Sequence, residues 1–434
     1  MRRVLRSIGG ERSGGFSRAL ALASAILIAW VTLSTIANPP TSYEKQGVAY
    51  LVNPPSIDVC SKTWVFGETT LCKSTLSQPL PVGVRYWESA TAFIPVLGYG
   101  SEPSSPDVNF KPHGKGSYTG QGVVVAVVDT GIDYMHPAFE GDAIIEMWTV
   151  LYRSGESGQF LHWVFGVNGS MTDLVTLDRG LRAIHGEYAF MDENGHGTHV
   201  AGIIAGRPVD GFVGFAPNAK LFIVKAFLKN GTASMDMVLD ALKIVYDNVE
   251  RLSVKVLNLS WGALLNSDGS DPISVAAGEI AKKGVLVFAA AGNEGNMPFK
   301  ILSPAVHPKV LAIGAVDPET GQIAPFSSWG TTVDLRMKPD FVTAGVSIVS
   351  ARSNASGLKP WKGDSRLTYL SGTSMATAVA SGIGAEYAEY WAMFEAPLGR
   401  NLVESFLKFQ EALVTRYNPH YKDFISGLGV LKSI

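Results

Sequence analysis

The strongest constraint on the fold is an alternation, from about Gly120 onward, of short apolar segments with segments of helical periodicity. The apolar segments are residues 123–128, 220–227, 254–259, 285–290 and 310–316. The helical segments are residues 197–206, 235–251 and 273–283. Strands that are apolar on both faces and separated by helices are typical of a parallel sheet covered on both sides. The sequence therefore predicts an α/β fold with a mostly parallel sheet and helices on both faces.

Three residues in separate motifs have the side chains that acyl transfer requires. Asp129 ends the first apolar segment, and we expect it at the carboxyl end of a strand, where open α/β sheets build their sites. His196 and Ser374 each lie beside glycine where a helix is expected to begin. A serine hydroxyl becomes an effective nucleophile when an imidazole takes its proton, and the imidazole needs a carboxylate to fix its orientation. Together the three residues predict nucleophilic catalysis.

Each of these residues also has a simpler interpretation. Alone, Asp129 would be a turn residue before Gly131, and Ser374 would be an ordinary helix N-cap. The pair His196 and His199 resembles two metal ligands, but no third ligand follows at a recognisable spacing. We therefore expect His199 to be a hydrogen-bonded structural residue and predict no metal in the site.

The motifs resemble those of the subtilisin-like serine proteases, the subtilase family, over about residues 116–434. They read Val-Val-Asp-Thr-Gly-Ile-Asp at 127–133, Gly-His-Gly-Thr-His-Val-Ala-Gly at 195–202 and Ser-Gly-Thr-Ser-Met-Ala at 371–376. The resemblance implies that Asp129 orients His196, that His196 is the general base and then the general acid, and that Ser374 is the nucleophile. It also implies a subtilisin-like fold and a serine endopeptidase activity.

Two further segments resemble parts of the family's substrate cleft. Residues 287–295, Val-Phe-Ala-Ala-Ala-Gly-Asn-Glu-Gly, resemble the oxyanion segment, which implies that Asn293 donates to the tetrahedral intermediate. Residues 257–262, Leu-Asn-Leu-Ser-Trp-Gly, resemble the strand that pairs with an extended polypeptide substrate. The walls of the P1 pocket would then be Ser260, Trp261 and Gly262 on one side and Ala290, Ala291 and Gly292 on the other. No acidic cluster near them demands a basic P1 residue, which favours a broad or apolar preference.

The chain departs from the family pattern at several positions. Ala378 stands where a proline usually follows the nucleophile, and Ala138 stands where many members have a calcium-binding Asp. We therefore expect that no cofactor is required and that calcium binding is in doubt. Residues 140–190 are longer than in compact members and rich in aromatic residues. They are expected to form a surface elaboration packed on itself or to rim the cleft as a substrate exosite. By resemblance, Ser303-Pro304 is expected to be cis.

The N-terminus carries a targeting signal. Five arginines precede an uncharged, mostly apolar run over residues 19–37, which is long for a signal peptide and just long enough to span a bilayer. Positive charge before the run favours export of the rest of the chain. Residues 1–37 are therefore a signal peptide cleaved near Ala37 or an uncleaved anchor, and membrane contact is expected only through residues 19–37. The expected location is extracellular or at the outer face of the cell membrane.

Residues 38–107 form an N-terminal extension or a propeptide before the peptidase domain, residues 108–434. They occupy the place of the family's inhibitory propeptide, and removal or retention are both open. Cys60 and Cys72 are the only cysteines in the chain. In an exported protein they favour one disulfide, with two unpaired thiols as the alternative.

The leading hypothesis is an exported serine endopeptidase that cleaves extended polypeptides through an acyl-enzyme on Ser374. The alternative is a catalytically silent binding protein on the subtilase fold, which the presence of all three catalytic residues and Asn293 disfavours. A third hypothesis is an acyl-transfer enzyme that is not a peptidase. A net charge of −2 gives no reason to expect nucleic acid as a partner.

Overall fold

The structure is a computed structural model of the 434-residue chain. It describes residues 48–54, 57–75, 85–94, 103, 118–153, 159–363, 366–416 and 422–433. The predicted signal peptide or anchor, residues 1–37, lies outside the described residues. Within the described ranges, no helix combines the length and the apolar character needed to cross a bilayer.

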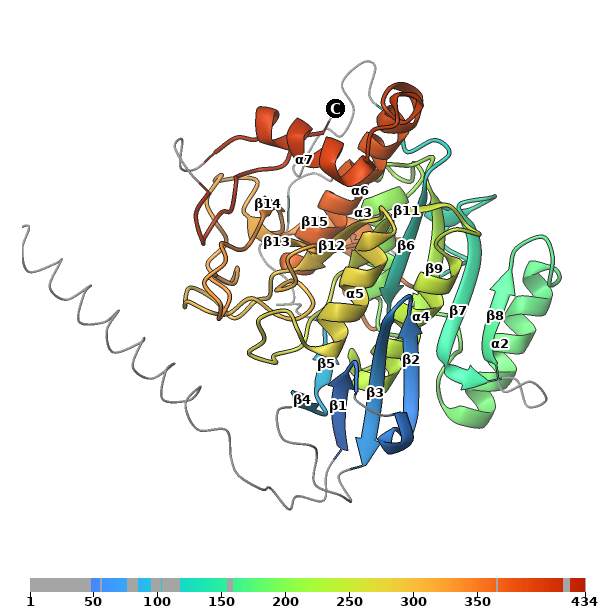
Figure 1. The fold of residues 1–434 in the computed structure, drawn as a ribbon. Coiled ribbons are helices and arrows are strands. Elements are labelled where there is room, and N and C mark those ends of the chain that lie inside the picture. The colour runs from blue at the N-terminus through green and yellow to red at the C-terminus, as the bar shows by residue number, and fades with distance from the viewer. Residues whose placement is uncertain are drawn as a thin grey trace, which may run out of the picture. The chain divides into compact units, whose positions relative to one another are not determined.

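The core of the molecule is an eight-stranded sheet with the order β14-β13-β12-β11-β6-β9-β7-β8 (Figure 1). Neighbouring strands from β14 to β7 run parallel, and only β8 is antiparallel to its neighbour β7. The strands are β6 Val124–Asp129, β7 Ile144–Arg153, β8 Phe160–Val164, β9 Lys220–Lys225, β11 Val254–Leu259, β12 Leu286–Ala290, β13 Leu311–Val316 and β14 Phe341–Ala344. Fully buried runs such as Leu286–Ala290 explain why a purely apolar segment becomes an interior strand.

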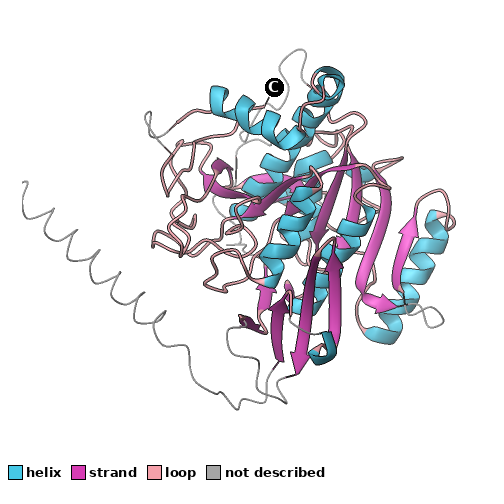
Figure 2. Ribbon diagram, viewed as in Figure 1, coloured by secondary structure: helices cyan, strands magenta, loops and turns pink. Residues whose placement is uncertain are grey.

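Helices cover both faces of this sheet (Figure 2). The helices are α2 Met171–His185, α3 His196–Ala205, α4 Met235–Asn248, α5 Pro272–Lys282, α6 Thr373–Phe394 and α7 Leu402–Leu413. Val125 and Val127 of β6 belong to the core under α3 and α6, whereas Ala126 and Val128 belong to the core under α4 and α5. This alternation places one core on each face and confirms the predicted mostly parallel sheet with helices on both sides.

A smaller antiparallel sheet precedes the central one, with the order β2-β3-β1-β4. Its strands are β1 Val48–Val52, β2 Lys62–Phe66, β3 Thr69–Thr75 and β4 Tyr86–Glu88. Its buried Trp64, Phe66 and Leu71 share a core with α4 and α5. Cys60 and Cys72 form a disulfide. The sequence shows only scattered apolar residues here, because half-buried strands this short give little periodicity.

The remaining described elements are short. Strand β5, Thr91–Phe93, pairs with β10, Thr232–Ser234, and β15, Ile348–Ala351, pairs with β16, Leu367–Leu370. Single-turn helices cover Ile57–Val59, Pro137–Phe139, Trp361–Gly363 and Ala396–Leu398. The Ser303-Pro304 bond is cis.

The long insertion between Asp129 and His196 does not pack only on itself, contrary to one expectation. Its first strand, β7, pairs in parallel with β9 and so extends the central sheet. Its helix α2 begins with a capping box made by Ser170 and Asp173 and ends at Gly186, whose left-handed backbone suits glycine. The chain then returns directly to the loop that carries His196.

Candidate active site

Adjacent parallel strands bring two predicted site residues to one edge of the sheet. In the pairing of β6 with β11, Val127 lies opposite Asn258. Asp129 and Ser260 follow these two residues by two positions each, so both lie at the carboxyl ends of neighbouring strands, about 4.8 Å apart across the sheet. The side chain of Ser374 is tied to this edge by Ser260.

His196 and Asp129 form a buried pair. The Nδ1 atom of His196 lies 2.7 Å from Oδ1 of Asp129, and both side chains are almost fully excluded from solvent. His196 begins α3, and Gly197 at the next position donates its N–H to the Thr130 hydroxyl at 2.9 Å. A methyl group on Gly197 would lie 2.2 Å from the carbonyl oxygen of Gly131. Only glycine therefore lets the His196 helix approach the Asp129 loop this closely.

Ser374 lies in the first turn of α6 and is held against the end of β11. Its hydroxyl donates to the carbonyl oxygen of Ser260 at 2.8 Å, and the Ser260 hydroxyl donates back to the carbonyl oxygen of Ser374 at 2.8 Å. Among the described residues, His196 Nε2 has no hydrogen-bond partner. Transfer of the hydroxyl proton to His196 thus requires the hydroxyl hydrogen to turn from the Ser260 carbonyl oxygen toward Nε2. Such hydrogen bonds commonly form only once a substrate is bound.

Asn293 is oriented by the residue that precedes Ser374. Its side-chain oxygen accepts from the Thr373 N–H at 3.0 Å and from the Thr373 hydroxyl at 2.9 Å. With its oxygen fixed on Thr373, the amide must place its NH₂ group on the opposite side. This arrangement suits a donor to an oxyanion formed next to Ser374.

The predicted substrate strand pairs with an extended segment of the chain itself. Phe93 and Gly262 exchange both backbone hydrogen bonds, at 2.9 and 3.0 Å, and the Ile94 N–H donates to the carbonyl oxygen of Gly231 at 3.3 Å. Residues 91–93 therefore run antiparallel to β10 on one side and to Gly262 on the other. The backbone at Gly262 can accordingly bind an extended peptide.

One predicted wall residue needs a correction. Trp261 is fully buried, packs against Phe227 with ring centroids 5.5 Å apart, and donates its indole N–H to the carbonyl oxygen of Val128 at 3.0 Å. Its side chain thus belongs to the core and does not line a pocket. Ala290, Ala291 and Gly292 are at the end of β12, where the expected second wall lies.

His199 has the structural role that the sequence suggests. Its Nε2–H donates to the carbonyl oxygen of Ile348 at 2.9 Å, and burial lowers its pKa to about 3. It is therefore neutral at physiological pH. Across the described part of the chain, no group of three or more His, Cys, Asp or Glu side chains is arranged to hold a metal ion.

The surroundings of Ala138 do not fit calcium. Its carbonyl oxygen accepts from the Arg207 N–H at 2.9 Å, and the Arg207 guanidinium pairs with Asp142. Calcium takes six to eight oxygen ligands, whereas the Ala138 side chain supplies none and its carbonyl oxygen already accepts from Arg207. The carboxylate of Asp142 is itself shared by Lys220 and Arg207, which hold its pKa well below the usual value.

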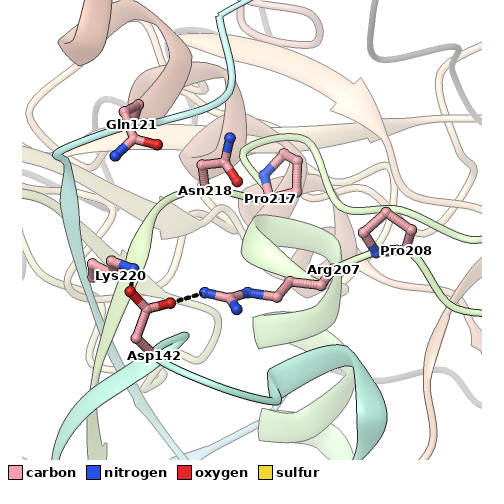
Figure 3. A pocket seen from close by; sticks show the side chains of 7 residues that line it. All are labelled: Gln121, Asp142, Arg207, Pro208, Pro217, Asn218 and Lys220. Atoms are coloured by element: carbon pink, nitrogen blue, oxygen red, sulfur yellow. Dashed lines mark hydrogen bonds and ion pairs between the residues drawn. The ribbon is translucent and has the colours of Figure 1, made fainter.

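These three charged residues line the cavity of about 420 Å³ in Figure 3, together with Gln121, Pro208, Pro217 and Asn218. Lys220 begins β9, and Gln121 precedes β6. The cavity thus lies toward the amino ends of the strands, whereas Asp129 and Ser260 lie at the carboxyl ends. It is no part of the candidate active site.

A buried carboxylate that the sequence motifs do not include, Asp178 of α2, supports the loop that leads to His196. It accepts hydrogen bonds from three consecutive backbone N–H groups, residues 189–191, at 2.5 to 3.1 Å. It also accepts from the Tyr134 hydroxyl at 3.1 Å. Burial raises its pKa. The signal available in the sequence is a carboxylate four residues after the buried Leu174, on the apolar face of a helix.

Asp192 and Lys225 continue this support toward His196. Asp192 accepts from the Gly195 N–H at 2.7 Å and from the N–H and hydroxyl of Thr198 at 2.8 and 2.7 Å. Lys225 is buried and donates to the carbonyl oxygen of Met191 at 2.7 Å. Burial lowers the pKa of Lys225, and the nearby carboxylates of Asp192 and Asp178 oppose that shift. The loop before His196 is thus fixed by buried polar groups on both sides.

Comparisons with known proteins agree with this geometry. A family model described as the subtilase family matches residues 120–403. The thermophilic serine proteinase of Bacillus sp. (strain AK1) is 32% identical over 285 residues, which are 65% of this chain and 54% of that protein. Serine protease AprX of Bacillus subtilis (strain 168) is 34% identical over 286 residues, which are 62% of this chain and 57% of that protein. The chain therefore spans about half the length of these two relatives.

The fold also has a counterpart among solved structures. The structure of sphericase aligns with a TM-score of 0.57 at 23% sequence identity. The alignment covers 77% of this chain and 99% of sphericase. At this identity the likeness shows the fold, which is subtilisin-like.

Proposed function

The chain belongs to the subtilase family, and we propose that it is an exported serine endopeptidase that hydrolyses extended polypeptides through an acyl-enzyme on Ser374. The observation that carries the proposal is the buried pair of His196 and Asp129, 2.7 Å apart, at the sheet edge to which Ser374 is tied. The names of the two relatives, a serine proteinase and a serine protease, support the same activity.

In the proposed mechanism the Ser374 hydroxyl transfers its proton to His196 Nε2 as its oxygen attacks the substrate carbonyl carbon. Asp129 holds the imidazole through Nδ1 and stabilises the imidazolium. The developing oxyanion accepts from Asn293 and from the backbone N–H of Ser374. His196 then protonates the leaving amine. Water attacks the acyl-enzyme in a second half-reaction, with His196 again as the base, and releases the acid product. No step needs a metal or an organic cofactor.

The first test is fluorophosphonate labelling of the full chain, measured by intact mass. The wild-type protein should gain one label, and Ser374→Ala should gain none. Ser381→Ala is the matched control, because Ser381 is a buried serine on the same helix whose hydroxyl donates to Asn258 at 2.9 Å. Asn293→Ala should reduce kcat by about 10² to 10³, a magnitude known from the corresponding subtilisin residue. A folded, full-length wild-type protein that remains unlabelled would indicate a latent precursor or the silent binding protein, and labelling of residues 108–434 would separate the two.

We also propose export through residues 1–37, which rests on the sequence pattern alone. Cleavage of this segment near Ala37 and its retention as an anchor would give different products. Expression of the full chain with subsequent cell fractionation and N-terminal sequencing separates them. A wild-type N-terminus at Met1 in the cytosolic fraction would contradict export.

We propose further that the N-terminal extension inhibits the peptidase from within the chain. The supporting observation is the pairing of Phe93 with Gly262 and of Ile94 with Gly231, which occupies backbone groups that an extended substrate would use. The sheet β1–β4 reinforces it by packing on α4, where Tyr50 donates to Asp236 at 2.6 Å and Trp64 donates to Asp240 at 2.7 Å. Tyr50 and Trp64 both precede, in the sequence, the segment that carries Phe93 and Ile94.

Self-processing is tested by following the mass of the chain with time. Wild-type protein should shorten to a product that begins after Ile94, while Ser374→Ala should keep its N-terminal extension. Equal masses in both proteins would contradict self-removal and would mean that the N-terminal extension stays attached as an inhibitor. Faster cleavage of a peptide substrate after the wild-type mass has fallen would show that the segment was inhibitory.

A further inference from the structure

One leucine lies between the two walls of the predicted P1 pocket. A methyl group built on Gly262 would lie 2.6 Å from Leu302 Cδ1, and one built on Gly292 would lie 2.7 Å from Leu302 Cγ. Real Cβ atoms do not approach other carbons this closely, so the Leu302 side chain is in contact with the backbone of both walls. The two segments, 260–262 and 290–292, are far apart in the sequence, and this side chain fills the space between them.

The backbone fixes Leu302 in that place. Its N–H donates to the carbonyl oxygen of Ala291 at 3.0 Å, next to the second wall. The next residue, Ser303, exchanges both backbone hydrogen bonds with Ala263, at 2.8 and 3.0 Å, and Ala263 continues the first wall. The backbone of Leu302 is therefore fixed between the two segments, Ala291 on one side and Ala263 on the other.

The space between the two walls is closed by an apolar group and carries no charge. Leu302, Ala290 and Ala291 are all fully buried. Trp261 cannot widen the opening by moving, because its indole ring is held in the core by Phe227 and Val128.

We propose that Leu302 forms the floor of the P1 pocket and restricts the enzyme to peptides with a small P1 residue, such as alanine, glycine or serine. This inference rests on the proposed peptidase function and replaces the broad or apolar preference expected from the sequence. One methylene group in an apolar pocket changes specificity by roughly 10- to 200-fold. A phenylalanine side chain is larger than an alanine side chain by several such groups, so the expected discrimination is large.

The test uses diphenyl phosphonate esters of single amino acids, which react with activated serine nucleophiles and which need only the P1 pocket. They do not require the backbone groups that Phe93 and Ile94 occupy. On the full wild-type chain, the alanine probe should label Ser374 at least about 50-fold faster than the phenylalanine probe. Leu302→Gly should raise the ratio of the phenylalanine-probe rate to the alanine-probe rate by about 10-fold or more.

Ile301→Ala is the matched control, because Ile301 is the adjacent buried apolar residue and is not among the atoms nearest to either wall glycine. It should leave the ratio of the two rates unchanged. Leu302→Ala should give an intermediate ratio and serves if Leu302→Gly does not fold.

The outcomes separate the two proposals. If fluorophosphonate labels wild type but the phenylalanine probe reacts as fast as the alanine probe, the inference about Leu302 is wrong and the peptidase function stands. The inference is equally wrong if wild type prefers alanine and neither Leu302 variant changes the ratio. If fluorophosphonate labels folded wild type neither with its N-terminal extension nor after that extension is removed, the proposed function itself fails. Should both variants fail to fold, the wild-type ratio alone decides.

Discussion

Two additions surround the central sheet, and they are attached in different ways. The N-terminal sheet β1–β4 contacts α4 through buried apolar residues, Trp64, Phe66 and Leu71, and through partly exposed ion pairs, Lys62 with Asp240 at 2.7 Å and Lys73 with Asp236 at 2.5 Å. The side chains of the four charged residues are 11 to 31% exposed. Ion pairs with this exposure contribute little and are weakened by salt.

The insertion between Asp129 and His196 is attached through a group that water does not reach. Asp178 is completely buried and accepts four hydrogen bonds, three of them from the backbone just before the catalytic loop. Removing a buried acceptor leaves its donors without partners, which is far more destabilising than losing a surface pair. The insertion is therefore an integral part of the framework around His196, whereas, within the described residues, the N-terminal sheet has no contact with the loop before His196 of the kind that Asp178 makes.

The largest expected effect comes from breaking the buried attachment. Asp178→Asn replaces an acceptor-only carboxylate by an amide whose NH₂ group cannot bind backbone N–H donors. The loop at residues 189–191 should shift and misplace His196. We expect kcat per titrated active site to fall by about 10- to 100-fold with KM nearly unchanged, because small misplacements of catalytic groups have effects of this size.

Glu146→Gln is the control for Asp178→Asn. Glu146 is also a buried carboxylate of the insertion, but its partners are Trp148 and Arg251, outside the catalytic loop. It should lower the melting temperature without changing kcat per titrated site. If Asp178→Asn behaves in the same way, Asp178 supports only the fold. Active-site titration with fluorophosphonate makes this distinction, because it counts functional sites and ignores unfolded protein.

A second prediction concerns the disulfide, which lies entirely within the N-terminal sheet region. Cys60 and Cys72 are separated by 12 positions in the sequence. A disulfide that closes a loop of about that length stabilises the folded state by about 3 kcal/mol. Replacing both by alanine should lower the stability of β1–β4 and leave the central sheet unaffected. Hydrogen exchange of Ser374→Ala protein measures both, because that variant should retain the N-terminal sheet. Faster exchange in β6 or β11 as well would mean that the two parts unfold as one unit.

The two additions also differ in how far the sequence could predict them. Apolar strands such as Leu286–Ala290 and the motifs around Asp129, His196 and Ser374 are local patterns, and the sheet edge that joins them follows from parallel order. The N-terminal sheet has no such pattern, because its strands expose one face and get their remaining burial from α4. Its position on the peptidase depends on contacts between distant segments.

Contacts between distant segments also explain why some site residues could be predicted from the sequence and others could not. The motif that contains Trp261 predicts a pocket wall, but a motif does not show which face of the strand points to the core. Leu302 and Asp178 could not be predicted, because neither lies in a motif. Their roles arise from Gly262 and Gly292 in one case and from residues 189–191 in the other, which only folding brings together.

The smallest expected effect comes from weakening the surface attachment of the N-terminal sheet. Asp240→Asn removes the charge that pairs with Lys62 and receives the Trp64 indole N–H. In the Ser374→Ala background, the free energy that holds the sheet on α4 should fall by about 1 kcal/mol. Limited proteolysis of residues 48–88 should accelerate by about 5-fold, and salt at about 1 M should produce much of the same change in the parent protein.

Asp247→Asn is the matched control for this prediction, since Asp247 lies on the same helix and pairs with Lys243 of that helix. It changes the charge of α4 by the same amount without touching β2. Equal acceleration by both variants would mean that proteolysis reports the helix and not the attachment. If neither Asp240→Asn nor salt has an effect, the apolar contacts of Trp64 and Phe66 hold the sheet, and release of the cleft must depend on cleavage of the chain and not on dissociation.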